Sequence, residues 1–379
     1  MNDGITYDVA IVGGGLAGLC LAVQMAKQQR KVILFEKESY PFHKVCGEYI
    51  SMESWPFLQR IGVPLQDMKL PVIKHLLLTS PDGTTLKTAL PLGGFGISRY
   101  TLDATLKDIA IKAGVTVLEQ CKVNSVKFSD EMFTIETTKG SFNATVCCGS
   151  YGKKSNLDVK WNRSFTQLQS RKLNHYAGIK YHVEIDYPVD TIALHNFKNG
   201  YCGISKIEGN KYCLCYLTHM SNISRAGQSI AAMEQTILSE NPHLKHILKN
   251  AIKLNEEPVT IAQISFLKKT QIEDHVLLLG DAAGMITPLC GNGMSMAMHA
   301  SLLATTAIES FLAGKISRTD MEENYINLWQ QNFAKRLATG RMIQYFFGKK
   351  WLTNLFIKTM KHFPPLTRKI IKMTHGNPF

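Results

Sequence analysis

Three glycines near the start of the chain have the spacing of a phosphate-binding turn. Gly13, Gly15 and Gly18 form the pattern G-x-G-x-x-G between an apolar stretch at 7–12 and an amphipathic stretch at 19–29. In a strand, turn and helix of this kind the glycines let the backbone approach a pyrophosphate, and unpaired N–H groups at the helix N-terminus bind the anion. Leu16 and Ala17 stand in this turn, between Gly15 and Gly18. The spacing therefore predicts a dinucleotide site.

A carboxylate stands 18 residues after the last of these glycines. Glu36 ends a second apolar stretch at 31–35, and Lys37 follows it. A carboxylate at the end of the second strand can accept hydrogen bonds from both ribose hydroxyls of an adenosine. We therefore expect Glu36 and Lys37 at the adenosine half of the ligand, although this motif does not choose between NAD and FAD.

A distant segment supplies a second group of possible cofactor ligands. An apolar stretch at 276–279 is followed by Gly280 and Asp281, then by Pro288 and a run at 291–294 that opens a helix. The run consists of Gly291, Asn292, Gly293 and Met294. This segment resembles the second flavin-binding motif of the para-hydroxybenzoate hydroxylase-like FAD-dependent oxidoreductases. The resemblance implies that Asp281 binds the ribityl chain and that 291–294 lies beside the flavin pyrimidine, where a helix N-terminus stabilises the charge of reduced flavin.

Two further positions resemble cofactor ligands of this superfamily. Arg99 matches its arginine at the start of a helix, which reaches the FAD phosphates and ribose, and Val123 matches the backbone that lines the adenine pocket. From spacing alone, Arg99 would be the partner of Asp103 in a helical salt bridge. The motifs together span residues 9–308 and imply that FAD is the cofactor.

The stretch at 41–48 contains the candidate catalytic residues. Lys44, Cys46 and the glycine that follows are similar to the K-x-C-G stretch of geranylgeranyl reductases and related halogenase-like proteins, which lies over the flavin near the substrate cavity. Beside a lysine, Cys46 could be a thiol of low pKa, and the alternative is a small residue that fills space against the flavin. Glu48 is a candidate proton donor, and the alternative is an ion-paired or solvated carboxylate.

The middle of the chain departs from the aromatic hydroxylases. These enzymes have an Asp-Gly pair that helps FAD and the nicotinamide cofactor to bind, whereas Tyr151 stands where the aspartate would be. No second G-x-G-x-x-G follows. Electrons would then come from NAD(P)H without a domain of its own, or from a partner reductase or other electron-donor protein. The halogenase pattern W-x-W-x-I-P is absent, and Gly200 and Tyr201 keep only two positions of the aromatic stretch of geranylgeranyl reductases.

These motifs require elements that bring them together. The expected fold class is α/β, with a Rossmann-type, glutathione-reductase-like FAD domain, an antiparallel-sheet substrate domain and a helical C-terminal region. Alternating stretches at 74–98 and 176–218, with turn signals at 81–83 and 199–200, predict the substrate sheet. The expected segments are 1–73, 99–165 and 265–340 for the discontinuous FAD domain, 74–98 and 166–264 for the substrate domain, and 341–379 for a basic helical cap.

The excess of positive charge is local. The net charge is +13, and residues 335–379 contain ten Lys or Arg and no Asp or Glu. A local excess argues against nucleic acid as a partner. Residues 341–375 interleave aromatic and basic side chains, so they could lie on an anionic membrane. The alternative is a helical cap with a solvated basic face.

Other sequence features bear on the compartment. The nine cysteines form no C-x-x-C pair, so neither a disulfide framework nor a metal site is indicated. No basic n-region precedes the apolar stretch at 9–26, and no other stretch has the length of a membrane span. We expect a cytoplasmic protein, peripheral to the inner face of the membrane if the basic tail binds lipid.

The leading hypothesis is an FAD-dependent monooxygenase, a hydroxylase or an epoxidase, that acts on a small apolar substrate, aromatic or polyene. The alternative enzyme is a flavin-dependent reductase of carbon–carbon double bonds that resembles geranylgeranyl reductase. An alternative of another class is a flavin-binding protein without turnover.

Overall fold

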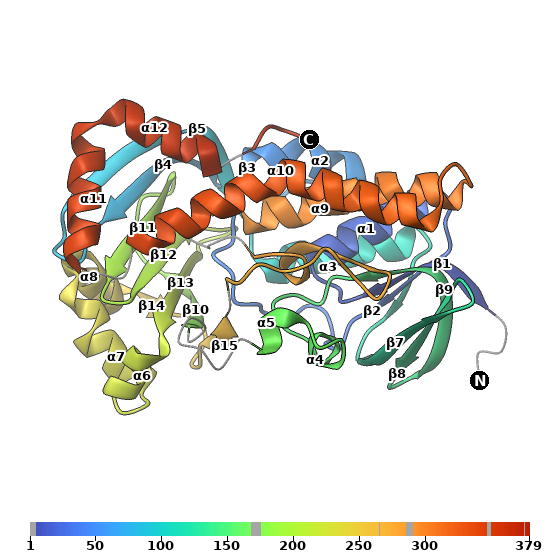
Figure 1. Cartoon of the computed structure of the whole chain (residues 1–379). Helices are drawn as coiled ribbons and strands as arrows, with labels where there is room; N and C mark the ends of the chain where they lie inside the picture. Colours follow the sequence, from blue (N-terminus) through green and yellow to red (C-terminus); the bar gives the residue numbers. More distant parts are fainter. Residues whose placement is uncertain (1–4, 168–175, 265, 286–290, 347–349, 375) are drawn as a thin grey trace.

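The chain folds around two sheets at opposite ends of an elongated molecule (Figure 1). The computed structural model describes residues 5–167, 176–264, 266–285, 291–346, 350–374 and 376–379. The α/β fold class expected from the sequence is confirmed, with a parallel sheet, a largely antiparallel sheet and a helical C-terminal region.

Sheet A contains the parallel strands expected for the cofactor domain. Its strands are β1 (Thr6–Val12), β2 (Val32–Phe35), β6 (Thr116–Leu118), β7 (Val123–Ser129), β8 (Met132–Thr137), β9 (Gly140–Gly149), β16 (Ile272–Glu273) and β17 (Val276–Leu278). Strands β17, β9, β1, β2 and β6 run parallel in that order, whereas β16, β7 and β8 pair in antiparallel fashion. The apolar runs of β1, β2 and β17 are buried, as in parallel sheets covered on both faces. The carboxyl ends of all five parallel strands therefore meet at one edge.

Helices cover sheet A and connect it to the rest of the chain. They are α1 (Leu16–Lys27), α2 (Trp55–Ile61), α3 (Arg99–Lys112), α4 (Asn156–Lys160), α5 (Ser164–Gln167), α9 (Gly293–Leu312) and α10 (Arg318–Phe346). Helix α9 packs between α1 and α10. The ion pair between Arg30 and Glu309, 2.9 Å long, joins the far ends of α1 and α9.

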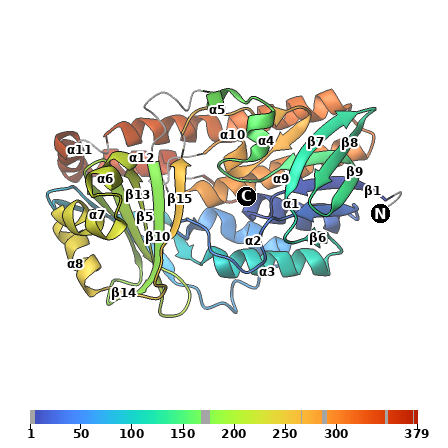
Figure 2. The ribbon, with the colours of Figure 1, turned by 90° about the horizontal axis from the view of Figure 1, so that it is seen from below.

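Sheet B is the larger of the two sheets. Its strands are β3 (Tyr49–Ser51), β4 (Val72–Thr79), β5 (Thr85–Gly96), β10 (Tyr176–Glu184), β11 (Thr191–Phe197), β12 (Gly200–Lys206), β13 (Tyr212–His219), β14 (Ile252–Lys253) and β15 (Val259–Ile264). They follow the order β14-β10-β13-β12-β11-β4-β5-β3, with β15 also on β10, and only β4 and β11 pair in parallel. Figure 2 shows α6 (Met220–Arg225), α7 (Ile230–Thr236) and α8 (Pro242–Asn250) on the face of sheet B that points away from sheet A.

The observed elements can be compared with the expected segments. The hairpin turn at 81–83 connects β4 to β5, and the turn at 199–200 leads from β11 into the first residue of β12, as expected. Strand β3 pairs with β5 in sheet B, although it falls in the segment 1–73 that we assigned to the FAD domain. The domain boundaries stay a prediction.

The last helices cover the end of sheet B. Helices α11 (Lys350–His362) and α12 (Pro364–Thr374) follow α10, and α11 packs against β5. Ile371 of α12 joins a small apolar cluster with Tyr49 and Ile73 of sheet B. None of the helices that the structure describes is long and apolar enough to cross a membrane.

Candidate functional site

The glycine turn lies at the carboxyl end of β1. Gly13 has φ +104°, and a Cβ there would lie 2.7 Å from the carbonyl oxygen of Ser150, which follows β9. A Cβ on Gly18 would overlap the Gly13 carbonyl oxygen and the Ser150 hydroxyl. Glycine at these two positions therefore lets α1 begin directly against β1 and β9.

The adenosine end of the expected site is formed at the ends of β1 and β2. Glu36 is 6% exposed, and its carboxylate accepts hydrogen bonds from the N–H groups of Gly14 at 2.9 Å and Glu38 at 3.1 Å. The Glu36 carbonyl accepts the N–H of Cys121 at 2.8 Å, which brings the start of β7, at Val123, to this edge. Lys37 points away: its side chain is 69% exposed and pairs with Glu38.

Two cations face the glycine turn. A Cβ on Gly15 would lie 3.7 Å from Nη2 of Arg99 and 4.0 Å from Nζ of Lys44, so the missing side chain leaves a cradle beside both. Asp103 holds the pair, at 2.7 Å from Arg99 and 3.0 Å from Lys44. Burial alone would raise the pKa of Asp103, but Arg99 and Lys44 outweigh it and hold the pKa below its ordinary value. A pyrophosphate fits this cradle, because the two cations and the helix N-terminus attract its charge while Asp103 holds the cations in place.

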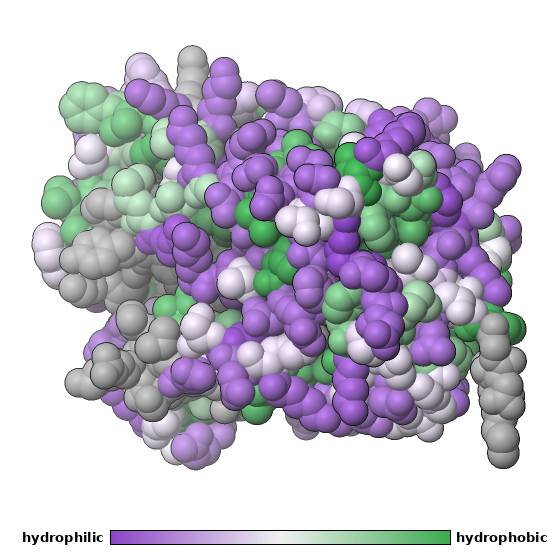
Figure 3. Space-filling view, turned by 45° about the vertical axis from the view of Figure 1, so that its right-hand side comes forward, coloured by the Kyte–Doolittle hydropathy of each residue, from purple (hydrophilic) through white to green (hydrophobic). Residues whose placement is uncertain are grey.

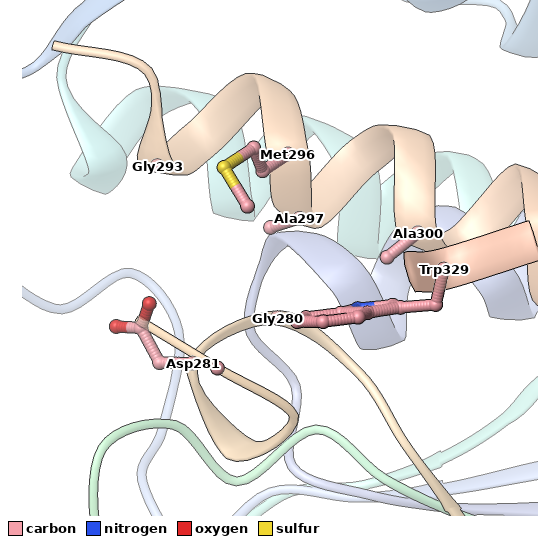
Figure 4. A pocket seen from close by; sticks show the side chains of 8 residues that line it. Gly280, Asp281, Gly293, Met296, Ala297, Ala300 and Trp329 are labelled. Atoms are coloured by element: carbon pink, nitrogen blue, oxygen red, sulfur yellow. The ribbon is translucent and has the colours of Figure 1, made fainter. Parts of the chain in front are cut away.

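Asp281 lies in a second turn at the same edge, directly after β17. Gly280–Ala282 form a 3-10 turn, in which Gly280 has φ +57° and fits between Ala17 of α1 and Ala297 of α9. The Asp281 side chain lines a hollow of about 10 Å³, room for one water, together with residues of α9 and Trp329 of α10 (Figure 4). The first turns of two helices therefore converge on the Asp281 turn.

The start of α9 joins this turn to sheet B. Gly291 has φ +65°, and a Cβ there would lie 3.3 Å from the ring of Tyr49 in β3. Asn292 is the N-cap residue, α9 begins at Gly293, and Met294 is buried. Pro288 lies outside the described residues.

The loop that carries the K-x-C-G stretch lies across sheet B. Three of its carbonyl groups accept hydrogen bonds from side chains of the sheet: Lys44 from Lys180 at 3.2 Å, Cys46 from Cys213 at 3.2 Å, and Gly47 from Ser205 at 3.3 Å. On the neighbouring residue, Val45 packs against Gly178, where a Cβ would lie 2.8 Å from it. Strands β10, β12 and β13 therefore fix the backbone of the loop.

Glu48 fixes the end of this loop in a buried ionic cluster. The carboxylate is fully buried; Oε1 accepts hydrogen bonds from the Lys180 ammonium and, at 2.8 Å, from the N–H of Arg99, and Oε2 lies 2.6 Å from Nε2 of His182. Burial alone would raise the pKa of Glu48, but His182 and Lys180 outweigh it and hold the pKa below its ordinary value of 4.5. As a carboxylate, Glu48 anchors the loop; its role as a proton donor stays a prediction.

A histidine of the same loop lies beside the cluster. His43 stacks on Tyr100 at 4.7 Å and meets the edge of His182 at 5.1 Å. Its buried Nδ1 has no hydrogen-bond partner among the described residues. Burial and the Lys180 charge lower the pKa of His43, so the ring is neutral at pH 7.

Family comparisons match both ends of this arrangement. The FAD binding domain family matches residues 8–43, which include the glycine turn and Glu36. The squalene epoxidase family matches residues 208–336, which run from sheet B through the Asp281 turn to α10. Both matches agree with the superfamily of FAD-dependent oxidoreductases that the motifs resemble.

Whole-chain comparisons extend this result. Conditioned medium factor receptor 1 of Dictyostelium discoideum is 24% identical over 375 residues, covering 91% of this chain and 71% of that protein. A digeranylgeranylglycerophospholipid reductase of Methanococcus vannielii is 25% identical over 369 residues, which cover 88% of this chain and 84% of that protein. The structure of the flavin-dependent brominase Bmp2 superposes with a TM-score of 0.77 at 20% identity, covering 98% of this chain and 93% of that chain. The cofactor is FAD, and the chain is an enzyme of the oxidoreductase class.

The structure brings most of the expected cofactor residues to one edge, from Gly13 and Glu36 to Arg99, Lys44 and Asp281. Sequence reasoning missed Lys180 and His182. They stand two apart among the buried residues of β10, which ends in the exposed Glu184, and alternate residues of a strand share a face. Two polar residues on one face of a buried strand were the signal that could have found them.

Arg163 is a third residue that sequence reasoning missed. It is 3% exposed and donates to Asp158 at 2.7 Å, to the Ala282 carbonyl at 3.0 Å and to the Thr270 carbonyl at 3.0 Å. The Tyr151 hydroxyl also donates to Asp158, at 2.8 Å. Tyr151, which replaces the aspartate of the hydroxylases, thus belongs to a network that holds the Asp281 turn. Thr270 and Ala282 are 107 and 119 residues from Arg163 in the chain, and no local pattern indicated these contacts.

Proposed function

We propose that the chain is an FAD-dependent monooxygenase, a hydroxylase or epoxidase, of a small apolar substrate, aromatic or polyene. The observation that carries the proposal is the loop at 44–48, which is tied by three carbonyl groups and one carboxylate to sheet B. A loop held in this way closes the carboxyl edge of sheet A against a second sheet. Oxygen transfer from a flavin requires a site from which water is excluded.

The residues that would bind FAD already face one another in the structure. Arg99, Lys44 and the N-terminus of α1 would hold the pyrophosphate, Glu36 the ribose, and Asp281 the ribityl chain. The first turn of α9 would lie at the pyrimidine, where its N–H groups stabilise negative charge. Bound FAD supplies electron transfer to oxygen, and the protein binds, orients and excludes water.

The substrate is expected on the face of sheet B that points to the loop. Gly178, Ser205 and Cys213 of this face contact the loop itself. Farther along the face, Tyr201 and Leu217 pack in the cluster that also contains the core of sheet A. An apolar wall of this kind suits a substrate without charge, and the family match to squalene epoxidase over residues 208–336 supports oxygen transfer.

The test is a single-turnover experiment. The FAD-loaded enzyme is reduced with dithionite and mixed with isotopically labelled oxygen and candidate apolar substrates. We expect a transient absorbance distinct from that of reduced and oxidised flavin, and one labelled oxygen atom in the product. Direct return to oxidised flavin with every substrate, without label in a product, would contradict oxygen transfer.

A reductase of carbon–carbon double bonds is the second candidate. It is favoured by the K-x-C-G stretch and by the Methanococcus vannielii relative, whose name specifies a lipid reductase. Such a reaction adds a hydride and a proton, and Lys180 and His182 are buried proton carriers beside the loop. Reoxidation of the flavin by a polyene without oxygen, with gain of two hydrogens in the product, would favour this candidate over the first.

The reduction of the flavin requires a separate source of electrons. Tyr151 donates to Asp158 within the Arg163 network, so the position of the hydroxylase aspartate has a structural role here. NAD(P)H bound without its own domain and a partner reductase remain the two candidates. Anaerobic reduction by NADPH alone, faster than turnover, would remove the need for a partner.

The C-terminal helices are proposed to contact a membrane surface, which would place the enzyme at the inner face of the membrane. Hydrophobic side chains are exposed among hydrophilic ones at the α11–α12 end of the molecule (Figure 3). The exposed fractions are 67% for Trp351, 55% for Leu355, 58% for Phe363 and 43% for Leu366. An exposed aromatic and basic helix surface binds anionic lipid headgroups.

A further inference from the structure

A groove lies between β5 and the last two helices, at the end of the molecule that is distant from β1 (Figure 1). It measures about 330 Å³. Its walls are formed by Thr85, Leu86, Lys87 and Thr88 of β5 and by Met360, Lys361, Pro364 and Thr367 of α11 and α12. This volume is in the range of sites that hold a small molecule or a headgroup.

The walls of the groove combine cations, hydroxyl groups and an apolar base. Lys87 and Lys361 are exposed, and Thr85 and Thr88 add hydroxyl groups on the β5 side. Leu86 and Met360 are buried, and the Thr367 hydroxyl donates to the Met360 carbonyl at 2.7 Å. The lining therefore combines two ammonium groups and two hydroxyl groups with buried apolar side chains, a combination that suits a phosphate attached to an apolar chain.

The surroundings of the groove contain little negative charge. Residues 335–379 contain no acidic residue, and the only acidic residue between 72 and 96 is Asp82. Asp82 accepts the Ser80 hydroxyl and the N–H of Thr84, the latter at 3.1 Å. An anion that enters the groove therefore meets a local excess of positive charge.

Two of the exposed apolar side chains stand at the rim of this groove, and two others lie nearer the start of α11. Phe363 and Leu366 flank Pro364, one of the wall residues. Trp351 and Leu355 are four residues apart and share a face of α11. The groove and the exposed apolar side chains therefore belong to the same two helices.

We propose that the groove binds the phosphate headgroup of an anionic phospholipid while the apolar side chains at its rim enter the bilayer. The inference rests on the proposed function, because an apolar substrate partitions into the membrane and reaches the enzyme there. The geometry commits the groove to a lipid, since a soluble phosphate ligand would have no use for the exposed apolar rim.

The test is flotation of the FAD-loaded enzyme with vesicles of phosphatidylcholine alone and of phosphatidylcholine mixed with phosphatidylglycerol. We expect binding to the mixed vesicles only. The double variant Lys87→Gln/Lys361→Gln should bind about 30-fold more weakly, since each basic residue near an anionic surface contributes about 1 kcal/mol. The control Lys112→Gln/Lys127→Gln removes two exposed lysines from α3 and β7 and should bind within about threefold of the wild type.

Three results would overturn the proposal. One is absence of binding to the mixed vesicles, and another is equal loss in the control, which would show a dependence on net charge alone. The third is saturable binding of inorganic phosphate, measured by calorimetry, without preference for mixed vesicles, which would indicate a soluble ligand. Flavin content and reoxidation are measured on the same samples, so a failure of the proposed oxygen chemistry is seen separately from a failure of lipid binding.

Discussion

His182 and Glu48 meet at 2.6 Å, between Nε2 and Oε2, although 134 residues separate them in the chain. His182 belongs to sheet B, and Glu48 ends the loop that begins at the cofactor edge of sheet A. The same carboxylate accepts the N–H of Arg99, whose side chain faces the glycine turn. One buried carboxylate thus connects the residue expected at the FAD phosphates to the sheet expected at the substrate.

Replacement of Glu48 should destabilise the protein and change its response to acid. Glu48→Gln leaves Lys180 buried without its counter-charge, so we expect the free energy of unfolding to fall by about 3–5 kcal/mol. The folded pKa of Glu48 lies below 4.5, so its contribution is present above that pH and is lost as the pH falls through the folded pKa. Denaturant unfolding between pH 7 and acid should show a flatter profile in Glu48→Gln. An equal change in the exposed control Glu240→Gln would contradict this account.

Removal of the Arg99 charge should weaken FAD binding. Charge-assisted hydrogen bonds contribute about 1.5–3 kcal/mol, so Arg99→Met should raise the dissociation constant of FAD roughly 10- to 100-fold. Arg99→Lys should recover part of the loss, which separates a role toward phosphate from a role in folding. FAD titration by fluorescence quenching measures the effect, and Arg225→Met on α6 is the matched control. Unchanged affinity in Arg99→Met would remove this residue from the site.

The role of Asp281 in flavin binding can be tested with a substitution that preserves the shape of the side chain. Asp281→Asn keeps the volume of the side chain and removes its charge, so we expect the protein to fold and to purify with less than stoichiometric flavin. Asp274→Asn, in the exposed turn between β16 and β17, should retain the wild-type absorbance of bound flavin. Full flavin content in Asp281→Asn would show that the alignment of this segment with the flavin motif is wrong.

The buried ammonium group of Lys269 should make the stability of the protein depend on pH in the alkaline range. Its ammonium donates to the carbonyl groups of Asp281 and Lys153, and burial lowers its pKa from 10.5 to about 8. Between these two values the unfolded chain binds a proton that the folded chain lacks, so stability should rise with pH from about 8 to about 10.5, by about 3 kcal/mol in all. Lys269→Met should abolish the rise, and Lys268→Met, an exposed neighbour, should keep it. If stability rose by the same amount in Lys269→Met, the rise would come from other titrating groups.

Replacement of Cys46 should distinguish a chemical role of its thiol from a packing role. It is half-buried, and its carbonyl group is held by Cys213. In the proposed monooxygenase no side chain is the oxidant, so Cys46→Ser should change the rate of product formation by less than about threefold, since it substitutes a group of similar size. Stopped-flow absorbance and product analysis measure the effect. Loss of product with full flavin content would instead assign a chemical role to the thiol.

The sequence predicted the parts of the site that depend on local pattern. The glycine turn and Glu36 can be inferred because a strand, a turn and a helix are adjacent in the chain. Asp281 required a resemblance, since a single aspartate after a short strand has many uses. The position of Arg99 over Gly15 required the fold, because the N–H of Arg99 is held by Glu48 and its side chain by Asp103.

The remainder could not be predicted because its contacts join distant segments. Lys180 and Glu48 are 132 residues apart, and Arg163 and Ala282 are 119 apart. The pairing of β3 with β5 was not predicted for a similar reason: three residues carry too little pattern to show that they form a strand or that their partner is β5. Periodicity specifies which face of a strand is buried, and it does not specify what lies opposite that face.

The carbonyl groups of Lys44, Cys46 and Gly47 are all bound by sheet B, and this has a consequence for the exchange of parts between relatives. A substrate sheet transplanted from another member of the superfamily would arrive with its own donors in place of Lys180, Ser205 and Cys213. The loop would then lose these three hydrogen bonds, even where the new sheet suited its own substrate. Under the proposed function, substrate specificity therefore depends on sheet B together with residues 44–48, two segments that must change together.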